Sequence, residues 1–294
     1  MKRFLFMFSI FSFATLIVMF FLIFFSCNFL QSASFRIPDN KNIIILGDST
    51  TANGIDDTIF SGAVNMSQGA TAYFYSYIKL RKFLKENPHL SKVIVAFHYT
   101  AINESEDDLV NGKKNILNKV PRYLFLFNMN EKIKFLNKPG VFHAAFKSIR
   151  LSAEAIPKLI KTGKVSYSDL KIGDYSRVYN NRLGVHIEHV KKKNTNNAFK
   201  YSQDQHEYLL KIVELCRDKN VELLLLNTPM YNLDKYIDTK DFLDYYNFYF
   251  SETKFLDFSN FVLPEYGYAD LIHLHYKGAE IFSQYLSDNY KEFF

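Results

Sequence analysis

The chain has 294 residues, a formal net charge of +6 and a hydrophobic fraction of 48%, with 30 Phe and 20 Tyr. This much apolar and aromatic surface excludes a disordered protein. Two cysteines are too few for a disulfide scaffold or a zinc-type cysteine cluster. The basic excess looks scattered, with its densest run at 191–193. Because no nucleic-acid-binding signature accompanies that run, we expect a solvated loop there and no nucleic-acid partner.

The first segment predicts a membrane anchor. Residues 4–25 contain no charged side chain, and a helix of that length covers about 33 Å, enough to cross a bilayer core. Lys2 and Arg3 precede the apolar run and the next positive charge is Arg36. The positive-inside rule therefore predicts a cytoplasmic N-terminus. We expect a single-pass cell-membrane protein, with an anchor over 1–30 and an extracytoplasmic remainder.

Two other interpretations of the N-terminus remain open. The small residues Ser32, Ala33 and Ser34 are typical of a signal-peptidase cleavage site. Cys27 after Ser26 weakly resembles a lipoprotein site. We do not expect Cys27, at the membrane edge, to pair with Cys216, which lies on the apolar stripe of a predicted helix.

After a polar linker over 31–41, predicted strands and helices alternate. Short apolar runs predict buried strands at 42–46, 63–66, 93–97, 221–226 and 254–257. Helical patterns follow an N-cap at Thr71 and stop at Pro88, and recur over 208–219 and 276–290. The alternation predicts an α/β fold over 42–294, a three-layer α/β/α arrangement around a mostly parallel five-stranded sheet.

The stretch at about 103–201 fits this alternation badly. It is polar and basic, with helical pieces over 120–136 and 142–160. We interpret it as a large insertion between the third and fourth strands. Insertions of this size often cover or shape a site.

Two short motifs could carry nucleophilic chemistry. Gly47-Asp48-Ser49 follows the first predicted strand, and ligands of open α/β sheets bind beyond the carboxyl ends of the strands. Asp48 or Ser49 could instead simply cap a helix. Asp270 and His273 stand just before the last helix. A serine needs a base to remove its proton, and an imidazole oriented by a carboxylate is such a base. Both motifs belong at the same edge of the sheet.

These motifs resemble the SGNH (GDSL-like) hydrolase superfamily, over roughly 42–294 with the insertion unmatched. The resemblance implies a flavodoxin-like sheet, Ser49 as nucleophile, His273 as general base and acid, and Asp270 as its orienting partner. It also implies an oxyanion hole built from the backbone N–H groups of Gly69, in the sequence Asn-Met-Ser-Gln-Gly, and Ser49. No metal or organic cofactor is implied.

The sequence departs from that family at two places. The third block of the family carries an Asn that completes the oxyanion hole within G-x-N-D, whereas here the strand is followed by residues 98–103, HYTAIN. His98, Tyr99 or Asn103 could substitute, and the sequence does not choose among them. His275 stands where many members carry Asn, a position that can serve as an N-cap.

An anchored domain of this kind resembles the subgroup that moves or removes acyl esters on cell-envelope carbohydrates, often beside a membrane-bound O-acyltransferase. We therefore expect a membrane-anchored serine esterase or O-acyltransferase, with an envelope glycan or acylated carbohydrate as substrate. The alternative is an inactive domain that binds glycan or scaffolds an acyltransferase complex. Tyr266 and Tyr268 are candidates to flank a glycan, and His186 with His189 is a weaker candidate metal pair.

Overall fold

The computed structural model describes residues 1–192, 199–232 and 238–289 of the chain. They divide into two compact units. The first unit is Met1–Phe35 with Asn111–Ile172, and the second is Arg36–Val110 with Gly173–Phe294. The middle of the predicted insertion therefore shares a unit with the N-terminal helix, while the flanks of the insertion belong to the unit that holds the sheet.

A fully parallel sheet forms the second unit. Its strands are β1 (Ile43–Leu46), β2 (Ala63–Asn65), β3 (Lys92–Ala96), β4 (Glu222–Asn227) and β5 (Lys254–Asp257). The order across the sheet is β2-β1-β3-β4-β5, and every neighbouring pair is parallel. All four residues of β1 are buried, because helices cover both faces of a parallel sheet and leave no solvent side. The predicted fold class is confirmed.

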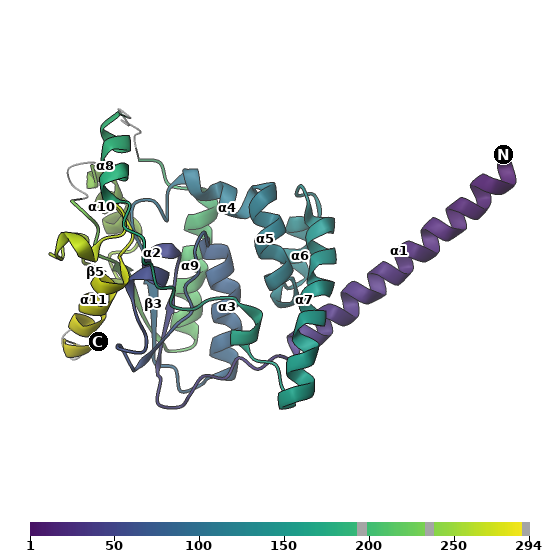
Figure 1. Cartoon of the computed structure of the whole chain (residues 1–294), viewed down its shortest axis with the longest axis horizontal. Coiled ribbons are helices and arrows are strands. Elements are labelled where there is room, and N and C mark those ends of the chain that lie inside the picture. The colour runs from purple at the N-terminus through teal and green to yellow at the C-terminus, as the bar shows by residue number, and fades with distance from the viewer. Residues whose placement is uncertain (193–198, 233–237, 290–294) are drawn as a thin grey trace. The chain divides into compact units, whose positions relative to one another are not determined.

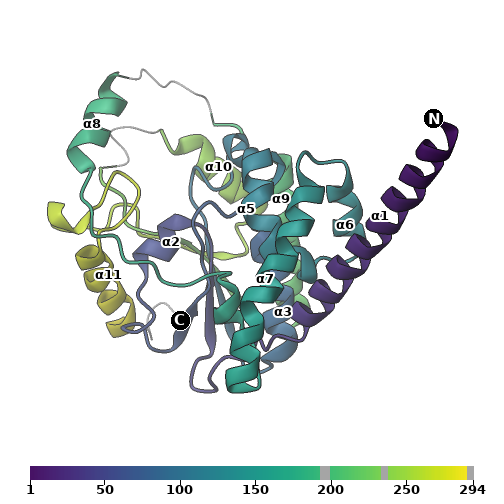
Figure 2. The same ribbon diagram turned by 45° about the vertical axis from the view of Figure 1, so that its right-hand side comes forward.

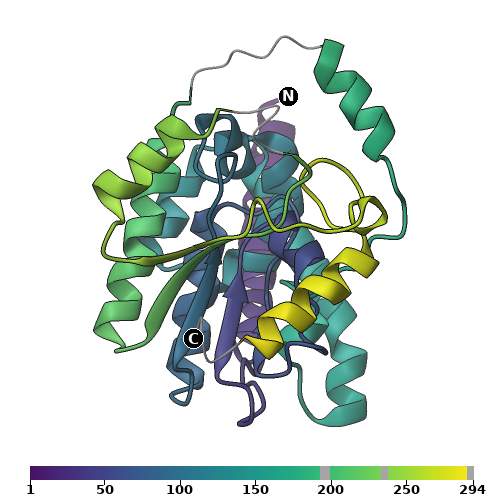
Figure 3. The ribbon, with the colours of Figure 1, turned by 90° about the vertical axis from the view of Figure 1, so that its left-hand side faces the viewer.

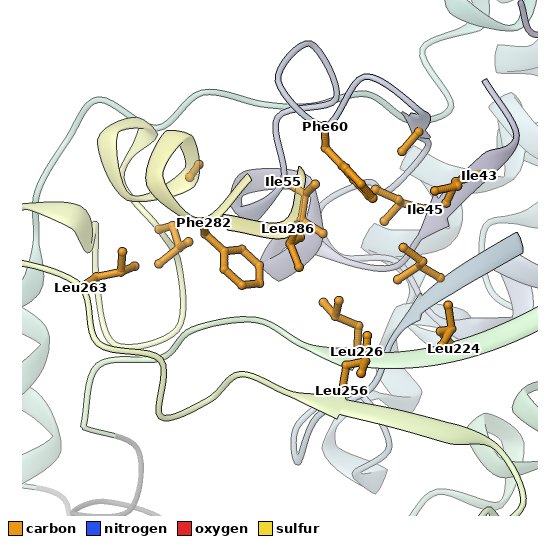
Figure 4. Close-up of a cluster of buried hydrophobic side chains, with 14 of the residues drawn as sticks. Ile43, Ile45, Ile55, Phe60, Leu224, Leu226, Leu256, Leu263, Phe282 and Leu286 are labelled. Atoms are coloured by element: carbon orange, nitrogen blue, oxygen red, sulfur yellow. The ribbon is translucent and has the colours of Figure 1, made fainter. Parts of the chain in front are cut away.

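The helices of the second unit lie on both faces of the sheet (Figure 3). They are α2 (Ser49–Gly54), α3 (Tyr73–Glu86), α4 (Asp108–Asn111), α8 (Leu183–Lys192), α9 (Gln203–Asp218), α10 (Lys240–Tyr249) and α11 (Tyr276–Asp288), with 3₁₀ turns η1 (Glu104–Asp107) and η5 (Glu265–Gly267). Figure 4 shows one apolar core, in which Ile45 and Leu226 of the sheet meet Phe282 of α11. On the other face of the sheet, α3 packs against α9.

The first unit is helical. It contains α1 (Lys2–Gln31), α5 (Lys113–Tyr123), α6 (Met129–Leu136) and α7 (Val141–Thr162), with 3₁₀ turns η2 (Leu124–Leu126) and η3 (Tyr167–Leu170). α7 packs against α5 and against the C-terminal part of α1 (Figures 1 and 2). The Ser152 hydroxyl lies 3.3 Å from the carbonyl oxygen of Ser26, a contact that ties α7 to α1.

The N-terminal helix α1 is long and apolar enough to cross a membrane, as predicted. Its 30 residues include an 18-residue window with a mean hydropathy of 2.6, none of which is buried in the protein. The helix extends to Gln31, and the chain beyond it is packed. Ala33 and Phe35 are buried, and the Phe35 ring lies 6.3 Å from the ring of Phe125. The first residues of the predicted linker therefore belong to the core of this unit. Cys27 and Cys216 are both free thiols.

Two helix starts differ from the prediction, one because of a tertiary contact and the other because of a local N-cap. The N-cap of α3 is Ala72, without a capping side chain, instead of Thr71. The backbone N–H of Tyr73 is satisfied by the side-chain oxygen of Gln205 at 3.0 Å. α9 begins at Gln203, five residues before the predicted start, because the Ser202 side chain caps it by accepting from the Gln205 N–H.

The helix predicted over 120–136 is wrong, and the predicted end of the last helix lies outside the described residues. Residues 120–136 do not form one helix: α5 ends at Tyr123, a 3₁₀ turn follows, and α6 starts from a capping box made by Asn128 and Glu131. The last helix ends at Asp288, and Tyr290, its predicted end, lies outside the described residues. The loop expected at the basic run 191–193 is wrong in part, because Lys191 and Lys192 form the end of α8. Lys193 and the asparagines after it lie outside the described residues.

Candidate active site

Gly47 allows the chain to turn sharply out of β1. A Cβ atom at this position would lie 2.4 Å from the Cβ of Ala96 and 2.5 Å from the Oγ1 of Thr51. A side chain at 47 would therefore force β1 away from β3. Asp48 then caps α2 by accepting from the Thr50 N–H at 2.8 Å, so Ser49 becomes the first residue of that helix. β1 and β3 are the neighbours where the order of the strands reverses, which is where open α/β sheets bind ligands.

The second motif lies on the loop between η5 and α11. The Asp270 carboxylate accepts from the backbone N–H groups of Ile272 at 3.0 Å and His273 at 2.9 Å, which closes the loop around the carboxylate. A Cβ on Gly278, in the first turn of α11, would lie 2.0 Å from the carbonyl oxygen of Gly267. Only glycine permits this contact, which holds the start of α11 against η5 and so fixes both ends of the loop.

The structure brings Ser49, His273 and Asp270 together in one unit of the fold. The Ser49 hydroxyl oxygen lies 2.7 Å from Nε2 of His273. Nδ1 of the same ring lies 2.8 Å from Oδ2 and 3.0 Å from Oδ1 of Asp270. Because an ionised carboxylate only accepts, Nδ1 carries the ring proton and Nε2 is left to accept the serine hydroxyl. This is the arrangement of a nucleophile, a base and an orienting carboxylate.

Asp270 is held in its ionised form. Burial by itself raises the pKa of a carboxyl group, but the hydrogen bond and charge of the His273 ring and the two backbone N–H donors outweigh it, so that the pKa of Asp270 is lowered. His273 and Asp270 are both partly accessible, with side-chain exposures of 23% and 16%. A substrate could therefore reach the ring, while the carboxylate stays mostly covered.

A second histidine–carboxylate pair involves Asp48, the residue that precedes the nucleophile in the chain. Nε2 of His98 is 2.9 Å from Oδ2 of Asp48. Nδ1 of His98 lies 2.8 Å from the Thr100 hydroxyl and accepts the Ala101 N–H at 3.4 Å. These partners fix the Nε2–H tautomer. His98 is 1% exposed, so the pair is an internal brace between the residue before Ser49 and the end of β3.

The charge of Asp48 depends on this brace. Burial raises the pKa of the Asp48 carboxyl group, but the neighbouring His98 ring and the hydrogen bonds from Thr50 outweigh burial and lower the pKa to about 2. The effect extends to Glu106, whose pKa is raised first by its own burial and then by the nearby Asp48 charge. The base of the site therefore carries a fixed negative charge.

The residues expected to form the oxyanion hole do not all have a group available to bind an oxyanion. A Cβ on Gly69 would be 3.8 Å from the Cβ of Ser49, so Gly69 borders the nucleophile as expected. Both ring nitrogens of His98 are engaged with other groups, which leaves no ring N–H of His98 for a substrate oxyanion. The Asn103 side-chain oxygen caps η1 by accepting from the Ser105 N–H at 2.9 Å. Of the three residues that the sequence left open as oxyanion donors, His98 lies next to the site but has no ring N–H left for an oxyanion.

Other predicted residues are distributed around the site. Nδ1 of His186 lies 4.0 Å from Oδ2 of Asp270, while the His189 side chain lies outside the described residues. Within the described part of the chain, no group of three metal-ligand residues forms a candidate metal site. Tyr268 is buried and its hydroxyl donates to the Phe261 carbonyl at 3.2 Å, so it is not open to a glycan. Tyr266 is 55% exposed.

His275 is the N-cap of the last helix, which is the role that the sequence suggested for this position. Its Nδ1 accepts the Lys277 N–H at 3.5 Å, a long contact. Its Nε2 lies 3.1 Å from the carbonyl oxygen of Tyr179. His275 therefore joins the start of α11 to the chain segment before α8, two residues beyond the catalytic candidate His273.

A cavity of about 190 Å³ lies near the Asp270–His273 loop, between the segments that follow β4 and β5. Tyr231 and Leu263 are among its lining residues. The Tyr231 N–H donates to the carbonyl oxygen of Leu271 at 2.9 Å, so the wall of the cavity is joined to the loop that carries His273. The cavity has a mixed polar and aromatic lining and lies in the same unit as the candidate triad.

Comparisons with known proteins leave the family open. One protein-family model, which carries no descriptive name, matches residues 168–294, less than half of the chain. No curated protein matches in sequence. The solved structures that are similar to this chain include the following two. One is provisionally named a platelet activating factor, from Streptococcus pneumonia (12% identity, TM-score 0.41, covering 94% of this chain and 98% of that one). The other is a provisionally named acylhydrolase from Bacteroides fragilis (11%, 0.37, 90% and 94%). At these identities and TM-scores the likeness assigns neither activity nor substrate.

The pairing of Asp48 with His98 is the feature that sequence reasoning missed. The signal was present, since Asp48 follows β1 closely and His98 follows β3. Val95 pairs with Leu46 across these two strands, which places the following residues side by side. Register between adjacent parallel strands predicts such a contact once the strand order is known, but the order itself was not fixed by the sequence.

Proposed function

We propose that this chain is a membrane-anchored serine esterase or O-acyltransferase that acts on acyl esters of a cell-envelope carbohydrate. The observation that carries the proposal is the hydrogen-bonded series from the Ser49 hydroxyl through the His273 ring to the Asp270 carboxylate. Such a series converts a poor nucleophile into a competent one. α1, with its uniformly apolar surface, supports the membrane anchor.

The reaction would proceed through an acyl-enzyme. Oγ of Ser49 attacks the acyl carbonyl carbon while its proton passes to Nε2 of His273. The tetrahedral intermediate collapses, and the leaving alcohol takes that proton from His273. Water or a sugar hydroxyl then gives its proton to His273 and attacks the acyl group. His273 returns that proton to Oγ of Ser49 as the bond between the acyl group and the serine breaks, which regenerates the serine. Asp270 stays ionised throughout and stabilises the imidazolium.

Transfer and hydrolysis differ only in which hydroxyl enters the second step. The oxyanion would be stabilised by backbone N–H groups of Ser49 and Gly69, since such donors in a partly enclosed site lower the barrier. Tyr266, exposed near the loop, is a candidate surface for a sugar ring. A membrane-bound O-acyltransferase that supplies the acyl group is the partner that this chemistry would use.

The test is covalent labelling of the full chain in detergent or nanodiscs with a serine-reactive fluorophosphonate, together with hydrolysis of an aryl acetate. Ser49→Ala should abolish labelling and lower turnover by about 10⁴-fold or more, because the acyl-enzyme cannot form. The matched control is Ser61→Ala, at an exposed serine on the loop after α2, which should label as the unmodified chain does. Full activity in Ser49→Ala would exclude this mechanism.

One observation favours a second, non-catalytic candidate function. His98 is one of the three residues that could replace the oxyanion side chain of the resembling family, and both of its ring nitrogens are already hydrogen-bonded to other groups. A domain with an incomplete oxyanion hole could bind glycan or scaffold an acyltransferase complex. No labelling of the unmodified chain, combined with retained binding to acetylated glycans, would favour that candidate over the enzyme.

A further inference from the structure

The first unit exposes large apolar side chains on neighbouring helices. Met129, Ile133 and Leu136 follow the i, i+4, i+7 spacing of one helix face on α6, and they are 69%, 57% and 52% exposed. Phe142 and Phe146 lie one turn apart on α7, at 70% and 39% exposure. α6 contacts α7 within this unit. We call these five residues the α6–α7 face. An exposed apolar set of this kind marks an interaction surface.

The α6–α7 face belongs to a strongly basic stretch of the chain. Residues 111–172 contain thirteen Lys and Arg against three Asp and Glu, a formal net charge of +10, whereas the whole chain carries +6. The basic excess that looks scattered in the sequence is therefore concentrated in one unit. Lys132, Lys134, Lys138 and Lys147 stand within a few residues of the apolar side chains. Exposed apolar residues flanked by lysines are typical of helices that lie in a membrane interface.

The same unit is joined directly to α1. α7 packs on the C-terminal part of α1 (Figure 2), through the contact between Ser152 and Ser26 and with Leu30 fully buried. Phe25, the last residue of the uncharged run, is 63% exposed and immediately precedes this packed segment. If α1 spans a bilayer, the packed helices begin where the apolar run ends, at the level of the lipid headgroups.

We propose that the α6–α7 face docks on the surface of an anionic phospholipid membrane, the membrane that α1 crosses. The apolar side chains enter the boundary between headgroups and acyl chains, and the surrounding lysines pair with headgroup phosphates. A second copy of the chain is a poorer occupant, because it would bring together two copies of residues 111–172, each with a net charge of +10. This inference rests on the membrane anchor in the proposed function and is independent of the chemistry at Ser49.

The experiment measures depth in the bilayer. The full chain, with Cys27→Ala and Cys216→Ala, carries one environment-sensitive fluorophore on a cysteine introduced by Ile133→Cys or Phe142→Cys. The probe is a nanodisc of phosphatidylcholine and phosphatidylglycerol containing a spin-labelled lipid quencher. Leu16→Cys in α1 reports the anchor, and Asp218→Cys, at the exposed polar end of α9, reports a charged surface position of the second unit. Quenching at 133 and 142 should reach at least about half of that at 16.

A charge variant keeps the proposal testable if a label disturbs α6. Lys132→Glu, Lys134→Glu and Lys138→Glu together should lower quenching at position 142 in anionic nanodiscs, with little change in pure phosphatidylcholine. Quenching at 133 and 142 no greater than at 218, with position 16 fully quenched, would overturn the docking surface and leave the anchor intact. Absence of quenching at 16 would overturn both. If the fluorophores at 133 and 142 instead report an apolar environment without lipid, and more strongly at higher protein concentration, the face mediates self-association and the proposal is overturned.

Discussion

Asp48 and His98 illustrate how a residue beside a nucleophile can matter without touching a substrate. Asp48 caps the helix that begins at Ser49, and His98 fixes the carboxylate from the neighbouring strand end. The pair therefore sets the direction in which Ser49 leaves the turn. The pair positions Ser49, so its loss should change both the free energy of unfolding and the reactivity of the Ser49 hydroxyl.

Removing His98 should be costly. His98→Ala leaves the Asp48 carboxylate, whose side chain is only 17% exposed, without its ring partner, and breaking such a largely buried pair costs about 3 kcal/mol of unfolding free energy. Urea unfolding of the full chain in detergent measures the loss. His143→Ala, at an exposed histidine on α7, is the matched control and should stay within about 0.5 kcal/mol of the unmodified chain. An unchanged unfolding midpoint in His98→Ala would show that the pair does not brace the turn.

The lowered pKa of Asp48 predicts how stability depends on pH. The folded pKa is about 2, below the unfolded value of about 3.9, so the contribution, about 2.5 kcal/mol, is complete above pH 4 and is lost as pH falls through 2. Asp48→Asn removes this titrating group. The slope of unfolding free energy against pH between 4 and 2 should therefore be shallower in Asp48→Asn. Identical slopes in the two proteins would place the acid sensitivity elsewhere.

At the scale of elements, the strands were predictable and several helix boundaries were not. β1 and β5 are short runs whose ends are clear from the local sequence, and the bounds of both strands lie within one residue of the prediction. α3 starts without a side-chain cap because Gln205, more than a hundred residues away, supplies the missing acceptor. No local pattern contains that information. The break between α5 and α6 did carry a signal, the capping box of Asn128 and Glu131.

The candidate site was predictable to a similar depth. Ser49, Asp270 and His273 could be chosen because a parallel sheet brings the ends of its strands to one edge. The engagement of His98 could not, since it depends on β1 and β3 being neighbours, and strand order is a property of the whole sheet. The sequence motifs therefore predicted which catalytic side chains meet. The strand order decided that the ring nitrogens of His98 are already hydrogen-bonded to other groups.

Close contact between β1 and β3 gives a prediction for Gly47. In Gly47→Ala the new Cβ would overlap the Ala96 and Thr51 side chains, and such overpacking typically costs about 1–3 kcal/mol. Because Ser49 follows two residues later, fluorophosphonate labelling should slow as well. The control is Gly184→Ala in α8, where a Cβ meets nothing within 4 Å and should stabilise the helix by about 0.5–1 kcal/mol. Equal stability of the two variants would contradict the tight β1–β3 contact.

At the scale of the whole molecule, charge and apolar surface are divided between the two units. Residues 111–172 carry ten net positive charges, while the rest of the chain carries 23 basic against 27 acidic residues. The candidate triad lies entirely in the second unit, and the apolar anchor and the α6–α7 face lie in the first. On this arrangement the basic first unit would attach the protein to the membrane, and the second unit, which has more acidic than basic residues, would carry the reactive serine.

The packing of the first unit bears on whether α1 is retained. Leu30 and Ala33 are buried at 0% and 2% exposure, and the Ser34 N–H donates to the carbonyl oxygen of Val165 at 2.8 Å. Cleavage after Ser34 would remove Leu30 and Ala33 from this core. Loss of the Leu30 side chain alone would cost about 2–5 kcal/mol, as large-to-small changes in cores do. We therefore expect the mature chain to keep residues 1–34. Intact mass spectrometry of the membrane fraction should give the uncleaved mass, 34.5 kDa, and a mass that begins at Phe35 would instead identify α1 as a removed signal.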